Sequence, residues 1–175
     1  MASTTQPIIE ATDTELAETA ECASPVDDRC EWFDRVVSFQ LADQCYALPI
    51  SRVQEIQQIV AFAEVPSDEG GVVGMVNLRG TIIPAVDMRA LLGLESRERS
   101  LDTPMVIGRS DAGLVALIVD HVDDVVELPM SCLQEPPALH SLSSRMLGVA
   151  RLGDGLAYVL DLDLVVNGSI MAGVA

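Results

Sequence analysis

The chain has 175 residues, of which 49% are hydrophobic and only 3% aromatic, and its formal net charge is −17. A chain of this length buries about two-thirds of its unfolded surface, so one or two compact units with a core of Val, Leu, Ile and Ala are expected. The acidic charge argues against nucleic acid and anionic lipid as partners, because both require a basic surface.

The chain begins with an acidic leader, residues 1–33. Its first 28 residues contain seven acidic residues and no basic residue, a composition that is typical of disorder. The leader lacks the features of a signal peptide, and no stretch approaches the roughly 18 to 20 apolar residues that span a bilayer. The four Cys residues show no C-x-x-C spacing. We therefore expect a cytoplasmic protein with reduced thiols and no direct membrane insertion.

Three strands are predicted after the leader. Apolar and polar residues alternate over 36–41 and again over 46–50, with a polar break between them, which predicts a β-hairpin. The segment 51–56 is too short for a strong helix prediction, and we interpret it as a turn that leads into a third strand.

The most informative stretch is residues 74–92. Two short apolar strands meet at the dipeptide Arg79-Gly80, and Asp87 can cap a short helix that ends at Gly93. This pattern places a guanidinium group at the tip of an apolar hairpin.

The same pattern returns 74 residues later, where Gly148, Leu152 and Asp161 correspond to Gly74, Leu78 and Asp87. A hairpin and a third strand over 105–128 likewise repeat the elements of 36–56. The polar segment 94–103 between the copies is the expected boundary. We expect a first unit at about 34–93, a second at about 103–168 and a tail at 169–175, and leave open whether the units exchange strands.

Short strands at regular intervals, with turn residues between them and no long helical period, predict an all-β protein. Two copies of the pattern predict two small antiparallel barrels with short helices. Barrel closure would also protect the edges of such Val-rich strands from aggregation.

No catalytic motif is present: the patterns of a nucleophile elbow, a zinc-protease helix, a phosphate-binding loop and a dinucleotide fold are all missing. The densest group of potential metal ligands is Asp120, His121, Asp123 and Asp124. On an extended strand, Asp120 and Asp124 share one face and the other two share the opposite face, so the four do not converge. We expect no catalytic residue, no metal and no cofactor. A small acidic metal-dependent hydrolase that uses this group is the alternative from another functional class.

Arg79 has two structural interpretations from the residues alone. It is either an exposed turn residue or part of an internal ion pair with a carboxylate such as that of Glu55, and exposed pairs of this kind are common and weak.

The sequence Val-Asn-Leu-Arg-Gly-Thr-Ile-Ile-Pro-Ala-Val-Asp-Met-Arg (76–89), preceded by the segment 46–56, resembles the signature of the CheW family, the small coupling proteins of bacterial chemotaxis arrays. The similarity runs from about residue 36 to about residue 166. It implies two five-stranded SH3-like barrels that pack together with a groove between them, and a non-enzymatic function.

The resemblance further implies an adaptor that bridges the cytoplasmic tip of a methyl-accepting chemoreceptor to the regulatory domain of a CheA-type histidine kinase. Such an adaptor is a monomer when free and assembles into rings with its partners. One alternative is a CheW-like adaptor of a related array that controls pilus or gliding motility or a second-messenger output. Another is a decoy or assembly factor that transmits no signal.

The resemblance also implies a receptor-binding site, in which Arg79 and Glu55 are the residues associated with receptor coupling. The expected receptor-binding residues are Val53, Glu55, Gly74, Asn77, Leu78, Arg79, Gly80 and Ala116. Ala116 and Ala150 stand where many relatives carry glycine, so their methyl groups either narrow the groove or fill the core.

Overall fold

The computed structural model describes residues 35–60, 63–64, 71–136 and 143–170. The predictions for the leader (1–33) and for residues 171–175 of the tail lie outside this part of the chain. The last helix continues to Ile170, two residues beyond the predicted end of the second unit.

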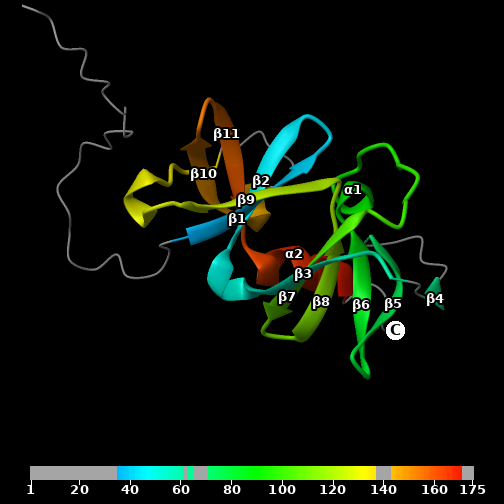
Figure 1. Ribbon diagram of the computed structural model, residues 1–175. Helices are drawn as coiled ribbons and strands as arrows, with labels where there is room; N and C mark the ends of the chain where they lie inside the picture. The colour runs from blue at the N-terminus through cyan, green and yellow to red at the C-terminus, as the bar shows by residue number, and fades with distance from the viewer. Residues whose placement is uncertain (1–34, 61–62, 65–70, 137–142, 171–175) are drawn as a thin grey trace, which may run out of the picture.

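The described residues form two β-sheets and a few short helices, which confirms the expected all-β fold (Figure 1). Sheet A contains, in spatial order, β10 (Met146–Leu152), β11 (Gly155–Leu160), β2 (Gln44–Pro49), β1 (Arg35–Leu41) and β9 (His121–Glu127). Sheet B contains β3 (Val53–Gln58), β7 (Pro104–Ser110), β8 (Gly113–Ile118), β6 (Thr81–Asp87), β5 (Val72–Leu78) and β4 (Ala63–Glu64). The helices are η1 (Ile50–Arg52), α1 (Met88–Leu91), η2 (Met130–Cys132), η3 (Ser143–Arg145) and α2 (Leu162–Ile170).

Each sheet combines strands from both halves of the sequence. The first hairpin, β1–β2, lies in sheet A with β9, β10 and β11, whereas β7–β8 lie in sheet B with β3 to β6. The exchange creates one parallel pairing in each sheet, β2 with β11 and β6 with β8. The expectation of purely antiparallel, five-stranded units is therefore corrected in two respects, because these two pairs run parallel and the two-residue β4 adds a sixth strand to sheet B.

The chain crosses between the sheets at two places that differ from the expected boundary. It leaves sheet A through η1, before β3, and returns at Val119 and Asp120, after β8. The polar segment 94–103 instead connects α1 to β7 within the sheet B unit. The return crossing has no polar, exposed linker, because Val119 is buried and the Asp120 amide donates to the carbonyl of Gln40 in β1.

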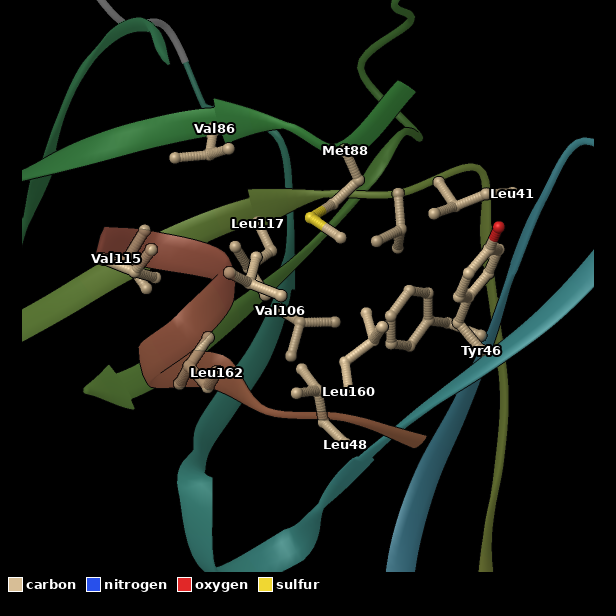
Figure 2. Packing of buried hydrophobic residues seen from close by; sticks show 14 of the residues in the cluster. Leu41, Tyr46, Leu48, Val86, Met88, Val106, Val115, Leu117, Leu160 and Leu162 are labelled. Carbon is tan, nitrogen blue, oxygen red and sulfur yellow. The ribbon is translucent and has the colours of Figure 1, made fainter. Parts of the chain in front are cut away.

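The largest hydrophobic cluster joins the facing sides of the two sheets with α2 (Figure 2). Leu48 and Leu160 of sheet A pack there with Val106 and Leu117 of sheet B, and Leu162 of α2 closes the cluster on one side. The alternate residues of each strand form two further clusters, one in each sheet, as expected for strands with side chains on both faces. The two sheets are thus held together by a continuous apolar core.

A partly buried ion pair reinforces the return crossing. The Arg89 guanidinium of α1 donates from Nε to Asp120 Oδ1 at 2.7 Å and from Nη2 to Asp120 Oδ2 at 2.8 Å. The same carboxylate accepts a hydrogen bond of 2.7 Å from the Ala42 amide in the β1–β2 turn. The two side chains are only 16% and 11% exposed. Asp120 therefore connects α1 of one unit to a turn of the other.

The stability contributed by Asp120 should depend on pH. Burial acts to raise the pKa of Asp120, but hydrogen bonds from Arg89 and the Ala42 amide, together with the charges of Arg89 and Arg97, outweigh it and hold the pKa below the ordinary value of 3.8. The unfolded chain therefore binds this proton more tightly than the folded chain. The stabilisation is fully present above about pH 4 and is lost as the pH falls through the lower folded pKa.

We expect the stability advantage of the wild type over Asp120→Asn to shrink as the pH is lowered from 4 towards 2. Urea unfolding of both proteins at each pH measures it. A difference that stays constant over this range would contradict the assignment.

Candidate functional site

The β5–β6 hairpin ends in a two-residue turn with a left-handed backbone. Arg79 has φ of 51° and Gly80 has φ of 93°, the signs required by a type I′ turn. The side chain of Asn77 stabilises the turn, since its Oδ1 accepts a hydrogen bond of 2.7 Å from the Gly80 amide. The predicted guanidinium at the tip of the hairpin is thus held at a fixed place.

The Arg79 guanidinium pairs with Glu55 of β3, with 2.6 Å between Nη2 and Oε2. Two strands, β7 and β8, separate β3 from β6 in the sheet. In a flat sheet these strands would place β3 and β6 about 14 Å apart. Sheet B must therefore curve strongly for the two side chains to meet. The two interpretations of Arg79 are found together, because it is an exposed turn residue and it also pairs with Glu55.

Stability does not account for this arrangement. A non-glycine residue in the left-handed region costs about 1 kcal/mol or more. The Arg79 side chain is 81% exposed and that of Glu55 is 23% exposed, and a pair with such an exposed member contributes about 0 to 1 kcal/mol. The two-residue turn itself requires this backbone, and Ala42 adopts it in the β1–β2 turn. What distinguishes Arg79 is the exposed charge that its turn carries.

The eight expected receptor-binding residues lie at different depths. Asn77, Arg79 and Gly80 are exposed, Val53 and Glu55 are partly buried, and Gly74, Leu78 and Ala116 are buried. The structure thus brings the exposed residues together at the hairpin tip and places the buried ones inside sheet B, where they expose little surface. Ala116 and Ala150 both belong to interior clusters, so their methyl groups fill the core and do not narrow a groove.

Comparison with known proteins identifies the family. A family model described as "CheW-like domain" matches residues 35–169. The chain belongs to the CheW-like family. "Chemotaxis protein CheW" of Helicobacter pylori is 23% identical over 132 residues, which are 75% of this chain and 80% of that protein. The protein of the same name from Rhizobium meliloti is 27% identical over 132 residues, 74% of this chain and 85% of that protein.

A solved CheW-like structure shares the fold. The scaffolding protein TtCheW of Thermoanaerobacter tengcongensis superposes with a TM-score of 0.69 and is 28% identical, covering 75% of this chain and 91% of that chain. The family is one of scaffold and adaptor proteins, which agrees with the lack of a catalytic motif in the sequence.

One exposed residue of this CheW-like hairpin was missed by sequence reasoning. Ile82 of β6 is 69% exposed and lies opposite Asn77 on β5. Alternation gave no decisive signal, because consecutive strand residues such as Ala85 and Val86 are both buried, on opposite faces of the sheet. Ile83 is buried, so Ile82 adds apolar area next to the turn.

The acidic group that motivated the hydrolase alternative does not converge in the CheW-like fold. Asp120 binds Arg89, whereas Asp123 accepts a hydrogen bond from Gln40 and His121 is exposed. Within the described part of the chain, no group of three or more His, Cys, Asp or Glu side chains could hold a metal ion.

A pocket of about 210 Å³ lies elsewhere, beside α1 and segment 94–103, and none of the eight expected residues lines it. Two of its charged groups, Arg89 and Asp120, pair with each other. Among the described helices of this CheW-like chain, none is long and apolar enough to cross a membrane.

Proposed function

We propose that the chain is a non-enzymatic cytoplasmic adaptor that couples the cytoplasmic tip of a methyl-accepting chemoreceptor to the regulatory domain of a CheA-type histidine kinase. The observation that carries the proposal is the CheW-like match over residues 35–169, supported by the strained hairpin tip that exposes Arg79. The receptor-contact surface consists of Asn77, Arg79, Gly80 and Ile82 at this tip, with Glu55 and Val53 on β3.

The chemistry of this surface suits a carboxylate on an amphipathic partner helix. The guanidinium is planar and can donate two parallel hydrogen bonds to a carboxylate. Ile82 provides apolar area, while Arg79 fixes the orientation of the partner. The buried Gly74, Leu78 and Ala116 shape the sheet that carries these groups and make no contact themselves.

The adaptor transmits a signal only if it contacts two receptor states differently, because a ligand shifts an equilibrium by its differential affinity alone. The free protein is a monomer, and it assembles into rings with the kinase regulatory domain beneath the receptors.

Replacement of Arg79 should weaken receptor binding about tenfold to a hundredfold, the range expected for loss of a charge-assisted hydrogen bond. Co-sedimentation with receptor-bearing membranes and the CheA-type kinase measures it for the wild type and Arg79→Ala. Arg151→Ala is the matched control, because Arg151 is an exposed arginine on the corresponding hairpin of sheet A. If the wild type binds neither receptor nor kinase, the proposal fails.

A double-mutant cycle with Arg79→Ala and Glu55→Ala determines whether the ion pair acts as a unit. We expect a coupling energy in receptor binding of about 0.5 kcal/mol or more, because Glu55 sets the position of the guanidinium. Strictly additive effects would show that the two residues contribute separately.

A further inference from the structure

The crossing from sheet A to sheet B carries a cluster of three charged side chains. Arg52, the last residue of η1, contacts Asp163 of α2 at 2.9 Å through Nη2 and Asp111 of the β7–β8 turn at 3.2 Å through Nη1. The two acids are also linked to each other, since the Asp111 amide donates to Asp163 Oδ1 at 2.7 Å. The contacts form a closed triangle between a crossing, a helix and a turn.

This triangle has a counterpart at the return crossing with the opposite arrangement of charge. There the crossing residue is an acid, Asp120, and the helix residue is a base, Arg89, and the amide of Ala42 in a hairpin turn completes the set. Arg89 lies two residues after the capping Asp87, as Asp163 lies two residues after Asp161. Both crossings thus carry an ion pair between the crossing and a helix, but the acidic and basic positions are exchanged.

The two sets of contacts differ in exposure. Arg89 and Asp120 are 16% and 11% exposed, whereas Arg52, Asp111 and Asp163 are 40%, 84% and 19% exposed. Pairs as open as those of Arg52 contribute little to the free energy of unfolding. The Arg52 triangle therefore calls for an explanation other than stability.

Its position supplies one. Arg52 directly precedes β3, the strand that carries Val53 and Glu55. The start of β3 pairs with Gly108 of β7, where a Cβ atom would approach Leu162 of α2 to 2.7 Å and the Arg52 carbonyl to 3.7 Å. The strands β3 and β7, helix α2 and the crossing thus meet at one close contact. The triangle links Arg52, the residue before β3, to α2 and to the β7–β8 turn.

We infer that Arg52, Asp111 and Asp163 are positioning residues that fix the start of β3, and through it the place of Glu55 and of the Arg79 guanidinium. The inference rests on the proposed function of the hairpin tip as a receptor contact. The three residues act through Glu55 and do not contact the receptor.

The test uses the full chain and the variants Arg52→Gln and Arg52→Asp/Asp163→Arg. Receptor binding is measured by co-sedimentation, and amide hydrogen exchange is followed by NMR at Asp111, with the Ala42 amide as internal reference. We expect Arg52→Gln to keep a denaturation midpoint close to that of the wild type, to accelerate exchange at Asp111 but not at Ala42, and to weaken receptor binding about fivefold.

The double variant copies the charge order of the return crossing, with the acid at the crossing and the base on the helix. It removes the Asp163 carboxylate that accepts a hydrogen bond from the Asp111 amide, so exchange at Asp111 should stay fast. It rebuilds the ion pair between crossing and helix, however, and should restore most of the binding, a rescue that mere disturbance of the fold would not give. If the wild type binds and Arg52→Gln binds equally well, the positioning inference is overturned and the proposed function stands. If the swap does not restore binding, the inference is likewise overturned. If the wild type does not bind receptor, the proposed function itself falls, and the positioning role with it.

Discussion

Arg89→Leu is expected to lower the free energy of unfolding by about 2 kcal/mol, below the range of about 3 to 5 kcal/mol for breaking a fully buried ion pair, because this pair is partly buried. The substitution leaves the Asp120 carboxylate 11% exposed, with the Ala42 amide as the remaining hydrogen-bond donor among its contacts at the crossing. Leucine fills a comparable volume, so the loss reflects the unpaired Asp120 carboxylate and the missing hydrogen bond from Arg89 Nη1 to the Glu95 carbonyl, and not a cavity. Urea unfolding followed by circular dichroism at pH 7 measures the effect.

Arg109→Leu is the matched control, because Arg109 is exposed on β7 and donates to the neutral side chain of Gln54. It should change stability by no more than about 0.5 kcal/mol. Adding Asp120→Leu to Arg89→Leu should recover part of the loss, since it removes the buried charge. A single variant as stable as the control would show that water solvates Asp120 well enough without its partner.

Gly148→Ala is expected to cost about 3 kcal/mol, the upper end of the range for overpacking. A Cβ atom at this position would lie 2.7 Å from the Gln134 carbonyl oxygen and would also overlap the Leu133 side chain. The Gln134 carbonyl cannot simply move aside, because it accepts a hydrogen bond from the amide of Val149, the next residue on β10. The thermal midpoint of unfolding is the measurement.

Gly155→Ala provides the control within the same hairpin. The atom closest to its added Cβ is the Leu152 carbonyl oxygen at 3.9 Å, an ordinary contact, so its stability should stay near that of the wild type. Equal midpoints for the two alanine variants would mean that segment 131–136 shifts away from β10 at little cost.

Local features of the fold could be predicted from the sequence. The turn at Arg79-Gly80 and the caps at Asp87 and Asp161 depend on residues within a few positions of one another, and all are found. The ion pair of Arg79 with Glu55 was one of two open interpretations, because an arginine at a hairpin tip reaches several possible carboxylates. Sequence patterns of this kind predict interactions between residues that are close together in the chain.

The pairing of distant strands could not be predicted in the same way. The alternation in β2 specifies which of its faces is buried, but it does not distinguish β11, more than a hundred residues later, from any other partner. For the same reason the pair of Arg89 with Asp120 went unnoticed, since neither residue stands out until the crossing brings them together.

The burial of the expected receptor-binding residues was the other property that could not be predicted from the sequence. The resemblance placed Ala116, Gly74 and Leu78 among the contact residues through their order in a motif, and order along a strand carries no information on which face is covered. Ile82 was missed for the same reason, because sheet B buries side chains on both faces and alternation does not show where that cover ends.

The exchange of strands between the two halves of the sequence has a consequence for folding during synthesis on the ribosome. Residues 53–118 hold all the strands of sheet B, so this sheet can pair as soon as it has been synthesised. The β1–β2 hairpin emerges earlier but cannot pair with its neighbours at once, because β9 and β11 lie in the last third of the sequence and are synthesised later. During that interval both of its edges are open to other nascent chains, and strands with open edges are those that chaperones must shield.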